Sequence, residues 1–202
     1  VVLRGAGKDF CAGADLEELL ASADREMAAN EASALRLGAL FEAFRALPKP
    51  VVAVVQGRAL AGGCGLATAC DLVFAAESAE FGYPEIQRGF VPAMVMAMLV
   101  RQVGEKRALD LTLTGRCLTA TEALSIGLVT DVIPDEYFEA QAAARAEQLA
   151  QISPTAYALT KQLCYAQDGL PFGDAIKLGA RINAMSRATP DFKAAIAAFL
   201  KK

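Results

Sequence analysis

The sequence predicts an α/β fold in which strands and helices alternate over residues 1–134 and helices alone follow over residues 135–202. Val51–Val55 is a continuous and mostly β-branched run, which is typical of a strand buried on both faces of a parallel sheet. After Pro134 the apolar residues recur at helical spacing. No repeat or low-complexity linker separates the two parts, so we expect an α/β core with a helical C-terminal region.

The chain begins with a predicted strand, a turn and a helix. Val1–Leu3 is apolar enough for a strand, and Gly5–Asp9 has the composition of a turn. Small residues then lead into Leu16–Leu20, whose apolar spacing is helical, and Asp15 is placed to cap that helix. Backbone N–H groups at such a helix start have no intrahelical partner.

The central part contains a long helix, the buried strand and a second turn of small residues. A helix over Met27–Leu47 is indicated by apolar residues at helical spacing and is ended by two prolines. After the strand Val51–Val55, the run Leu60–Gly65 lets another group approach the backbone closely and then opens a helix over Leu66–Cys70. Short strands are expected over Asp71–Ala75 and Phe81–Tyr83.

The remaining elements are mostly helices. A capping box at Thr119–Glu122 opens a helix that Gly127 closes, and Val129–Ile133 reads as a strand. The other predicted helices cover Val91–Val100, a segment from about Glu105, Tyr137–Ile152, Pro154–Gln167 with Ser153 as cap, Phe172–Arg187 and a segment after Pro190.

Composition excludes several classes of protein. The chain has 202 residues, 54% of them hydrophobic, which suits one globular domain. Its net charge of -3 lacks the excess of basic residues that is typical of a nucleic-acid-binding protein. The apolar stretch Phe90–Val100 is shorter than the roughly 20 residues of a membrane span. We therefore expect no nucleic-acid or membrane partner and a cytoplasmic location.

The absence of histidine narrows the possible chemistry. Histidine triads, H-E-x-x-H zinc sites and histidine proton shuttles are all excluded. The five cysteines form no C-x-x-C pair and are expected to be small buried hydrophobes in a reducing compartment. General acid or base work must therefore fall to Glu, Asp, Lys, Tyr or Cys, and we predict no metal.

The two turns of small residues, Phe10–Asp15 and Leu60–Gly65, can act together. Each precedes a helix start, where free N–H groups and the helix dipole favour an anion. One such turn alone is also explained by close packing of a strand on a helix. Two outward-pointing N–H groups that converge on one oxygen would form an oxyanion hole.

Both stretches resemble the crotonase, or enoyl-CoA hydratase/isomerase, superfamily. The family's FCAGADL element matches Phe10–Leu16, and its long element around KPVVA, the glycine turn, ACD and FGxPE matches Lys49–Glu85. The similarity continues to the helical tail and so spans essentially the whole chain. The resemblance implies the crotonase-like (ClpP/crotonase) spiral of strand–helix units, with an acyl-CoA-binding core over residues 1–134 and a trimerisation region over 135–202.

The resemblance also implies roles for individual residues. The N–H groups of Ala14 and Gly62 would hold the thioester oxygen, and Glu85 would transfer protons at the α or γ carbon of the substrate. The apolar residues Phe81, Phe90 and Val91 are expected to help by raising the pKa of Glu85. No cofactor is implied, because CoA is part of the substrate. The residues expected to bind the substrate or its CoA part are Lys8, Ala12, Gly13, Asp15, Leu16, Gly65, Phe90, Phe199 and Lys202, with the two lysines as phosphate contacts and Phe199 and Lys202 reaching the CoA of a neighbouring subunit.

One departure from the family concerns the kind of reaction. Hydratases of the best-known type use two glutamates to hold the attacking water, and the first lies twenty residues before the second; here that position is Gly65. With Glu85 alone the chain is more similar to members that move a double bond, although some members named hydratases also carry Gly there. Decarboxylation, dehalogenation, thioester hydrolysis, and binding of acyl-CoA or RNA without turnover remain alternatives.

A second departure concerns the beginning of the chain. Family members carry several tens of residues before the FCAGAD element, including early strands, so we expect the sequence to be a portion of a longer protein. The tail from Tyr137 onward has apolar faces in excess of what one small sheet should cover, with residues such as Ile176, Leu178, Ile182 and Met185. Together with the resemblance, this predicts a homotrimer or a hexamer built as a dimer of trimers.

Overall fold

The strands of the computed structural model, which describes residues 1–201, form two small sheets. The first has the order β1-β2-β4-β7 and is parallel throughout, whereas in the second, of order β3-β5-β6, only β3 and β5 run parallel. The strands are β1 (Val2–Arg4), β2 (Val52–Val55), β3 (Arg58–Leu60), β4 (Leu72–Ala76), β5 (Glu80–Gly82), β6 (Cys117–Thr119) and β7 (Asp131–Ile133).

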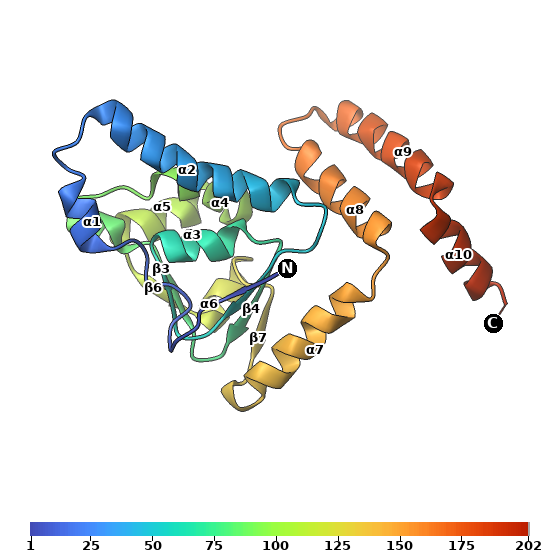
Figure 1. The fold of residues 1–202 in the computed structure, drawn as a ribbon, viewed down its shortest axis with the longest axis horizontal. Helices are drawn as coiled ribbons and strands as arrows, with labels where there is room; N and C mark the ends of the chain where they lie inside the picture. The colour runs from blue at the N-terminus through green and yellow to red at the C-terminus, as the bar shows by residue number, and fades with distance from the viewer. Residues whose placement is uncertain (202) are drawn as a thin grey trace.

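Helices cover the sheets and then form the rest of the chain (Figure 1). They are α1 (Leu16–Ala21), α2 (Met27–Ala46), α3 (Gly62–Ala69), α4 (Ala93–Val103), α5 (Glu105–Thr114), α6 (Ala120–Ser125), α7 (Phe138–Ala150), α8 (Pro154–Ala166), α9 (Phe172–Ala188) and α10 (Pro190–Phe199), with short 3-10 helices η1 (Pro84–Arg88) and η2 (Asp135–Tyr137). The α/β fold class is confirmed.

The buried strand predicted from Val51–Val55 forms the centre of the first sheet. Every residue of β2 is buried, and the strand pairs in parallel with β1 on one side and β4 on the other, with Ala53 opposite Leu3 and Val73. A strand enclosed in this way has no solvent-facing side, which explains why its sequence is a continuous apolar run and not an alternating one.

Two sequence predictions about the central region were wrong or incomplete. The helix expected from Leu66 begins four residues earlier, because α3 includes the glycines Gly62, Gly63 and Gly65. Glycine is a poor helix former in isolation, so tertiary contacts must favour the helix here. The strands β3 and β6 and the turn η1 were not predicted, because none of them has the length or periodicity that marks an element in a sequence.

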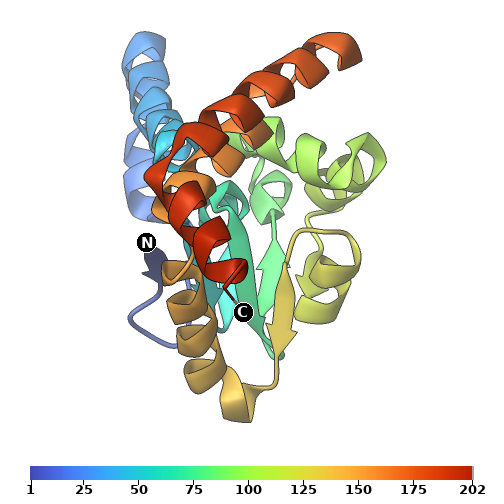
Figure 2. The same cartoon turned by 90° about the vertical axis from the view of Figure 1, so that its right-hand side faces the viewer.

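The helices after β7 extend away from the sheets. Figure 1 shows α9 and α10 beside α8 and at the opposite end of the molecule from α1, and Figure 2 shows the strands behind α7 and α10. No helix within residues 1–201 is both long and apolar enough to cross a membrane. The division of the chain into units at residue 134 stays a prediction.

Candidate active site

The two turns of small residues meet at the start of α3. A Cβ added to Gly13 would lie 3.1 Å from the Cβ of Ala61 and 3.9 Å from the backbone N of Gly62. A Cβ added to Gly63 would overlap the carbonyl oxygen of Cys11. Gly13 also has a φ of +103°, which a side chain would disfavour. Small residues are therefore required in both turns because the two backbones touch.

Two backbone N–H groups next to this contact between the turns have no acceptor within residues 1–201. Ala14 follows Gly13, and Gly62 is the first residue of α3; neither N–H donates to an acceptor within residues 1–201. The residue between strand and helix, Ala61, has a φ of 53° and a ψ of -128°, and its own N–H donates to the Gly82 carbonyl at 2.8 Å. Such a conformation costs about 1–3 kcal/mol in a residue other than glycine. The surrounding contacts therefore hold Ala61 in a conformation that leaves the Gly62 N–H free.

Asp15 caps the first helix, as predicted from its position. One carboxylate oxygen accepts hydrogen bonds from the N–H groups of Glu17, at 2.8 Å, and Glu18, at 3.4 Å. The cap fixes the direction in which α1 leaves the turn that contains Ala14. Leu16 is 57% exposed, so it is not part of the core.

Glu85 lies in η1, directly after the proline that begins this 3-10 helix. The residue is only 8% exposed, and its Oε2 atom is buried without a hydrogen-bond partner among residues 1–201. Burial raises the pKa of the Glu85 carboxyl, since the charged form loses its hydration. A buried and unpaired carboxyl of this kind is suited to accept and return a proton.

The environment of Glu85 differs in part from the sequence prediction. Of the apolar residues expected to raise its pKa, Phe81 is fully buried, but Phe90 and Val91 are 46% and 59% exposed. The exposed pair follows the end of η1, where the Phe90 N–H donates to the Glu85 carbonyl at 3.1 Å. Phe90 therefore lies close to Glu85 along the chain but is not part of the core.

A buried polar cluster between α3 and Tyr83 was not predicted from the sequence. The hydroxyl groups of Thr68 and Tyr83 are 2.6 Å apart, and the Thr68 hydroxyl donates to the Cys64 carbonyl at 2.8 Å. Burial raises the pKa of Cys64 to about 12 and also raises that of Tyr83. Both groups therefore stay neutral, and Cys64 is no nucleophile. The four-residue spacing of Cys64 and Thr68 on one helix was the available signal.

The space that a side chain at position 65 would need is already occupied in this protein. A Cβ added there would overlap Cγ1 of Val95, on α4, and lie 3.4 Å from Cζ of Phe41, on α2. Val95 and Phe41 are both buried, at 4% and 5% exposure. A larger side chain at position 65 therefore has no room unless Val95 moves, because Val95 already fills that position.

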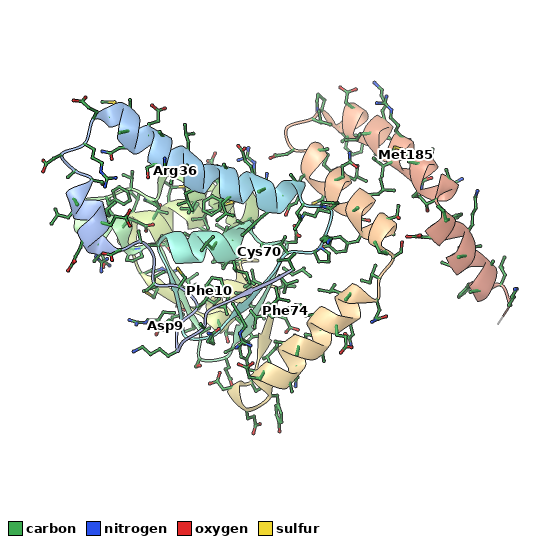
Figure 3. The ribbon with its side chains drawn as sticks, viewed as in Figure 1. Asp9, Phe10, Arg36, Cys70, Phe74 and Met185 are labelled. Carbon is green, nitrogen blue, oxygen red and sulfur yellow. The ribbon has the colours of Figure 1, made fainter. Side chains whose placement is uncertain are left out.

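The other predicted binding residues are spread over the surface. Lys8 and Ala12 are exposed next to the first turn; their neighbours Asp9 and Phe10 are labelled in Figure 3, and the Asp9 carboxylate pairs with Arg58 at 2.7 Å. Phe199 is 76% exposed at the end of α10, far from α1 and α3 in Figure 1. Lys202 lies outside the described residues. The structure therefore brings Gly13, Ala14 and Gly62 together but leaves Phe199 apart within one chain.

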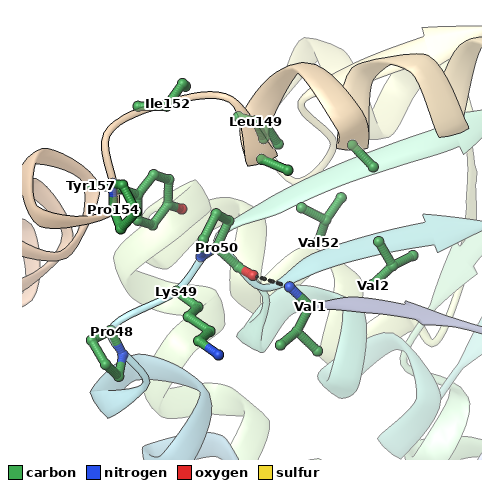
Figure 4. A pocket seen from close by; sticks show the side chains of 12 residues that line it. Val1, Val2, Pro48, Lys49, Pro50, Val52, Leu149, Ile152, Pro154 and Tyr157 are labelled. Carbon is green, nitrogen blue, oxygen red and sulfur yellow. Dashed lines mark hydrogen bonds between the residues drawn. The ribbon is translucent and has the colours of Figure 1, made fainter.

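A pocket of about 270 Å³ lies elsewhere in the molecule, at the amino ends of β1 and β2 (Figure 4). Val1, Pro50, Leu149 and Tyr157 are among its lining residues, and the N-terminal ammonium group donates to the Pro50 carbonyl at 2.7 Å. None of the predicted site residues lines it. Within residues 1–201, no group of three or more His, Cys, Asp or Glu side chains could hold a metal ion.

Comparison with known proteins supports the interpretation of the fold. The profile of the enoyl-CoA hydratase/isomerase family matches residues 1–202. A protein of Thermus thermophilus, whose name assigns it to the enoyl-CoA hydratases, is 46% identical over all of this chain and 80% of its own length. The 2,3-dehydroadipyl-CoA hydratase of Escherichia coli is 36% identical over all of this chain and 77% of its own length. The crystal structure of an enoyl-CoA hydratase from Mycobacterium smegmatis superposes with a TM-score of 0.93 at 31% identity, over 99% of this chain and 77% of that one.

The class that the fold and the meeting of the two turns define is therefore the crotonase-type α/β proteins. The chain belongs to the enoyl-CoA hydratase/isomerase family, whose members are acyl-CoA lyases and isomerases. The resemblance stated from the sequence is confirmed. The roles of individual site residues stay predictions.

Proposed function

We propose that this protein moves protons on an enoyl-CoA thioester, with Glu85 as the only proton carrier and the N–H groups of Ala14 and Gly62 as the oxyanion hole. The observation that carries the proposal is the buried Glu85 carboxyl, which has an unpartnered oxygen and a raised pKa. The convergence of the two turns supplies donors for the thioester oxygen. Each preorganised donor contributes about 3 kcal/mol to lowering the barrier.

The proposed reaction balances without any cofactor, because CoA is part of the substrate. The Glu85 carboxylate removes a proton from C2 of a 3-enoyl-CoA, and the electron pair forms the dienolate whose oxygen the two N–H groups stabilise. C4 then takes the proton back from Glu85. As it does so, the C3–C4 bond becomes single and a double bond forms between C2 and C3. The product is the 2-enoyl-CoA, and Glu85 is again a carboxylate.

Addition of water to a 2-enoyl-CoA is the second candidate, and the names of the relatives favour it. In that reaction the hydroxyl of water would bond to C3 and a proton would be added at C2. We favour migration of the double bond, since Gly65 supplies no carboxylate to orient water and Val95 fills the space that a side chain there would need. Decarboxylation, dehalogenation and thioester hydrolysis use the same oxyanion hole with other substrates.

The deciding experiment offers 2-enoyl-CoA and 3-enoyl-CoA of several chain lengths to the protein and identifies the products. We expect 3-enoyl-CoA to be converted to 2-enoyl-CoA faster than 2-enoyl-CoA is hydrated. Rapid hydration of crotonyl-CoA without migration would contradict this preference. Tight binding of every thioester without turnover would favour a non-catalytic acyl-CoA-binding role.

Binding should depend on the CoA thioester and not on the acyl group alone. The oxyanion hole favours a carbonyl oxygen that gains charge, and Lys8 lies exposed where it could meet a phosphate of CoA. Calorimetry with an acyl-CoA and with its free acid tests this expectation. Equal affinities for the two compounds would contradict the proposed substrate class.

The proposed assembly is a homotrimer or a dimer of trimers in the cytoplasm. Support comes from large apolar side chains exposed on the terminal helices, including Ile176, Phe192 and Phe199, which are 58%, 40% and 76% exposed. Helix α10, which ends at Phe199, lies away from α1 and α3 in Figure 1, so we propose that Phe199 meets a ligand in a neighbouring subunit. A monomeric mass by light scattering at micromolar concentration would reject this assembly.

A further inference from the structure

We infer that the ion pair between Asp9 and Arg58 sets the register between the two turns of small residues, and thereby positions the backbone N–H groups of the proposed oxyanion hole. Asp9 comes directly before the first turn, and Arg58 begins β3, which leads into the second turn. The inference rests on the proposed function. It assigns a positioning role to two residues that lie outside the turns themselves.

The Asp9 carboxylate accepts three hydrogen bonds, and all three come from Arg58. Its Oδ1 atom accepts from the backbone N–H at 3.0 Å and from Nε at 3.1 Å, and its Oδ2 atom accepts from Nη2 at 2.7 Å. These bonds lower the pKa of the Asp9 carboxyl to about 2, so the group is charged at neutral pH. Paired contacts between a guanidinium and a carboxylate fix direction as well as distance. Because one bond comes from the backbone, the pair holds the chain at position 58 and not only a side chain.

Beyond the ion pair, the two segments run side by side toward the turns. Cys11 and Ala59 form a parallel β-bridge, and the Cys11 N–H and carbonyl make backbone hydrogen bonds of 3.1 and 2.9 Å with the residues on either side of Ala59. The same alignment continues two residues further, where a Cβ added to Gly13 would lie 3.1 Å from the Cβ of Ala61. The next residue of each segment carries one of the two proposed N–H donors.

The segments also touch at the ion pair itself. A Cβ added to Gly57 would overlap the carbonyl oxygen of Lys8 and lie 2.8 Å from Oδ1 of Asp9. Gly57 has a φ of +56°, which other residues rarely adopt. The two backbones are therefore aligned from Gly57 to Ala61. A slip of one residue between them would break the hydrogen bonds of Asp9 and shift the two N–H donors relative to each other.

The ion pair should affect the reaction rate more than stability. The side chains of Asp9 and Arg58 are 20% and 47% exposed, and ion pairs at the surface contribute little to the free energy of unfolding. The rate is more sensitive, because a displacement of about 1 Å in a catalytic group can cost about 10²-fold. A change in kcat without a matching change in melting temperature would thus separate positioning from folding.

The test compares wild type with Asp9→Ala and Arg58→Ala. Asp9→Ala removes all three hydrogen bonds, whereas Arg58→Ala keeps the one from the backbone N–H. We expect kcat for double-bond migration to fall about 10²-fold in Asp9→Ala and about tenfold in Arg58→Ala, with KM changing much less. Asp9→Asn keeps an oxygen for the backbone N–H, so it should resemble Arg58→Ala, and it replaces Asp9→Ala if that variant does not fold.

A second measurement reports on the N–H groups without turnover. Butyryl-CoA is saturated, so its double bond cannot migrate, and its thioester carbonyl can be labelled with ¹³C. Hydrogen bonds from an oxyanion hole polarise the carbonyl and lower its infrared stretching frequency. We expect this shift on binding to be smaller in Asp9→Ala than in wild type.

The matched control is Glu139→Gln. The Glu139 carboxylate also accepts two hydrogen bonds from one arginine, Arg4, at 2.8 and 2.9 Å, but this pair joins β1 to α7. The control should keep the kcat and the infrared shift of wild type, and an equal fall of kcat in Glu139→Gln would contradict the inference. If wild type shows the shift and the Asp9 variants keep both the shift and kcat, the register inference is wrong while the proposed function stands. If the carbonyl band of wild type does not move on binding, the proposed oxyanion hole is wrong, and the inference fails with it.

Discussion

At the scale of single residues, Glu85 is the group on which the proposed chemistry depends. Replacing it by glutamine keeps the shape of the side chain but removes the base, so kcat for double-bond migration should fall by about 10²- to 10⁴-fold. The affinity for acyl-CoA should stay nearly unchanged, because the thioester oxygen is held by backbone groups. Steady-state kinetics and calorimetry on wild type and Glu85→Gln check both expectations. An equal loss of affinity and activity would show that the substitution disturbs binding.

The raised pKa of Glu85 gives a prediction about pH. Because the base must be ionised, kcat/KM should rise with pH through a pKa above the ordinary value of 4.5. For stability the sign is opposite: the folded state holds this proton more tightly than the unfolded chain does. The stabilising contribution is therefore complete below pH 4.5 and is lost as the pH rises through the raised pKa. Melting curves from pH 4 to 8 should show Glu85→Gln gaining stability over wild type toward neutral pH.

The two helical glycines at positions 62 and 65 should respond differently to alanine. Gly62→Ala adds a methyl group in open space and should not lower stability, since alanine is the better helix former by about 1 kcal/mol. Gly65→Ala forces its methyl group against Val95 and should cost about 1–3 kcal/mol. Urea unfolding of both variants measures the difference. Val95→Ala should restore the stability of Gly65→Ala, and equal stabilities of the two single variants would contradict the packing described here.

At the scale of elements, α8 is attached to the α/β core by a buried ion pair. The Lys161 ammonium group, whose side chain is 5% exposed, donates to Asp71 at 2.7 Å and to the Phe44 and Lys49 carbonyls at 2.6 and 3.1 Å. The other carboxylate oxygen of Asp71 accepts from the Tyr165 hydroxyl at 2.8 Å. These contacts join α8 to the end of α2 and to the residues that flank β2 and β4.

Removing the lysine should therefore leave a buried carboxylate without its counter-ion. We expect Lys161→Met to lower the free energy of unfolding by about 3–5 kcal/mol. The matched control is Lys177→Met, because Lys177 pairs with Asp174 at the surface, at 2.9 Å and with 76% of its side chain exposed. That variant should be close to wild type in urea unfolding. Similar losses for the two variants would mean that burial of the Lys161 pair has no special effect.

At the scale of the whole molecule, the terminal helices carry the predicted contacts between subunits. Ile176 lies on α9 and is 58% exposed, and Met185, labelled in Figure 3, is 50% exposed on the same helix. Placing a charge within an apolar interface is costly, so Ile176→Asp should reduce the mass measured by light scattering to that of a monomer. The helical circular dichroism should remain. Lys177→Asp introduces the same side chain at a polar position and should keep the mass of wild type.

The sequence by itself determined the fold class and most of the elements. The run Val51–Val55 predicted a strand buried on both faces, and caps such as Asp15, Ser153 and the Thr119–Glu122 box marked helix starts; the structure confirms both. These signals are local, because a cap or a β-branched run acts on neighbouring residues. The pairing of the Phe10–Asp15 and Leu60–Gly65 turns was also expected from the sequence, since both need small residues before a helix.

Only the tertiary structure decided which groups are close across the chain. A sequence gives no distance between residues far apart along the chain, so it could not show that Val95 fills the space at Gly65 or that Thr68 and Tyr83 share a hydrogen bond. The strands β3 and β6 are only three residues long and form because partners are present in β5. The burial of Glu85, and with it the raised pKa, likewise depends on how η1 packs against the core. The sequence shows which residue types are present and in what order. It does not show how deeply a side chain is buried or which neighbour occupies the space beside it, because both depend on how the folded chain packs.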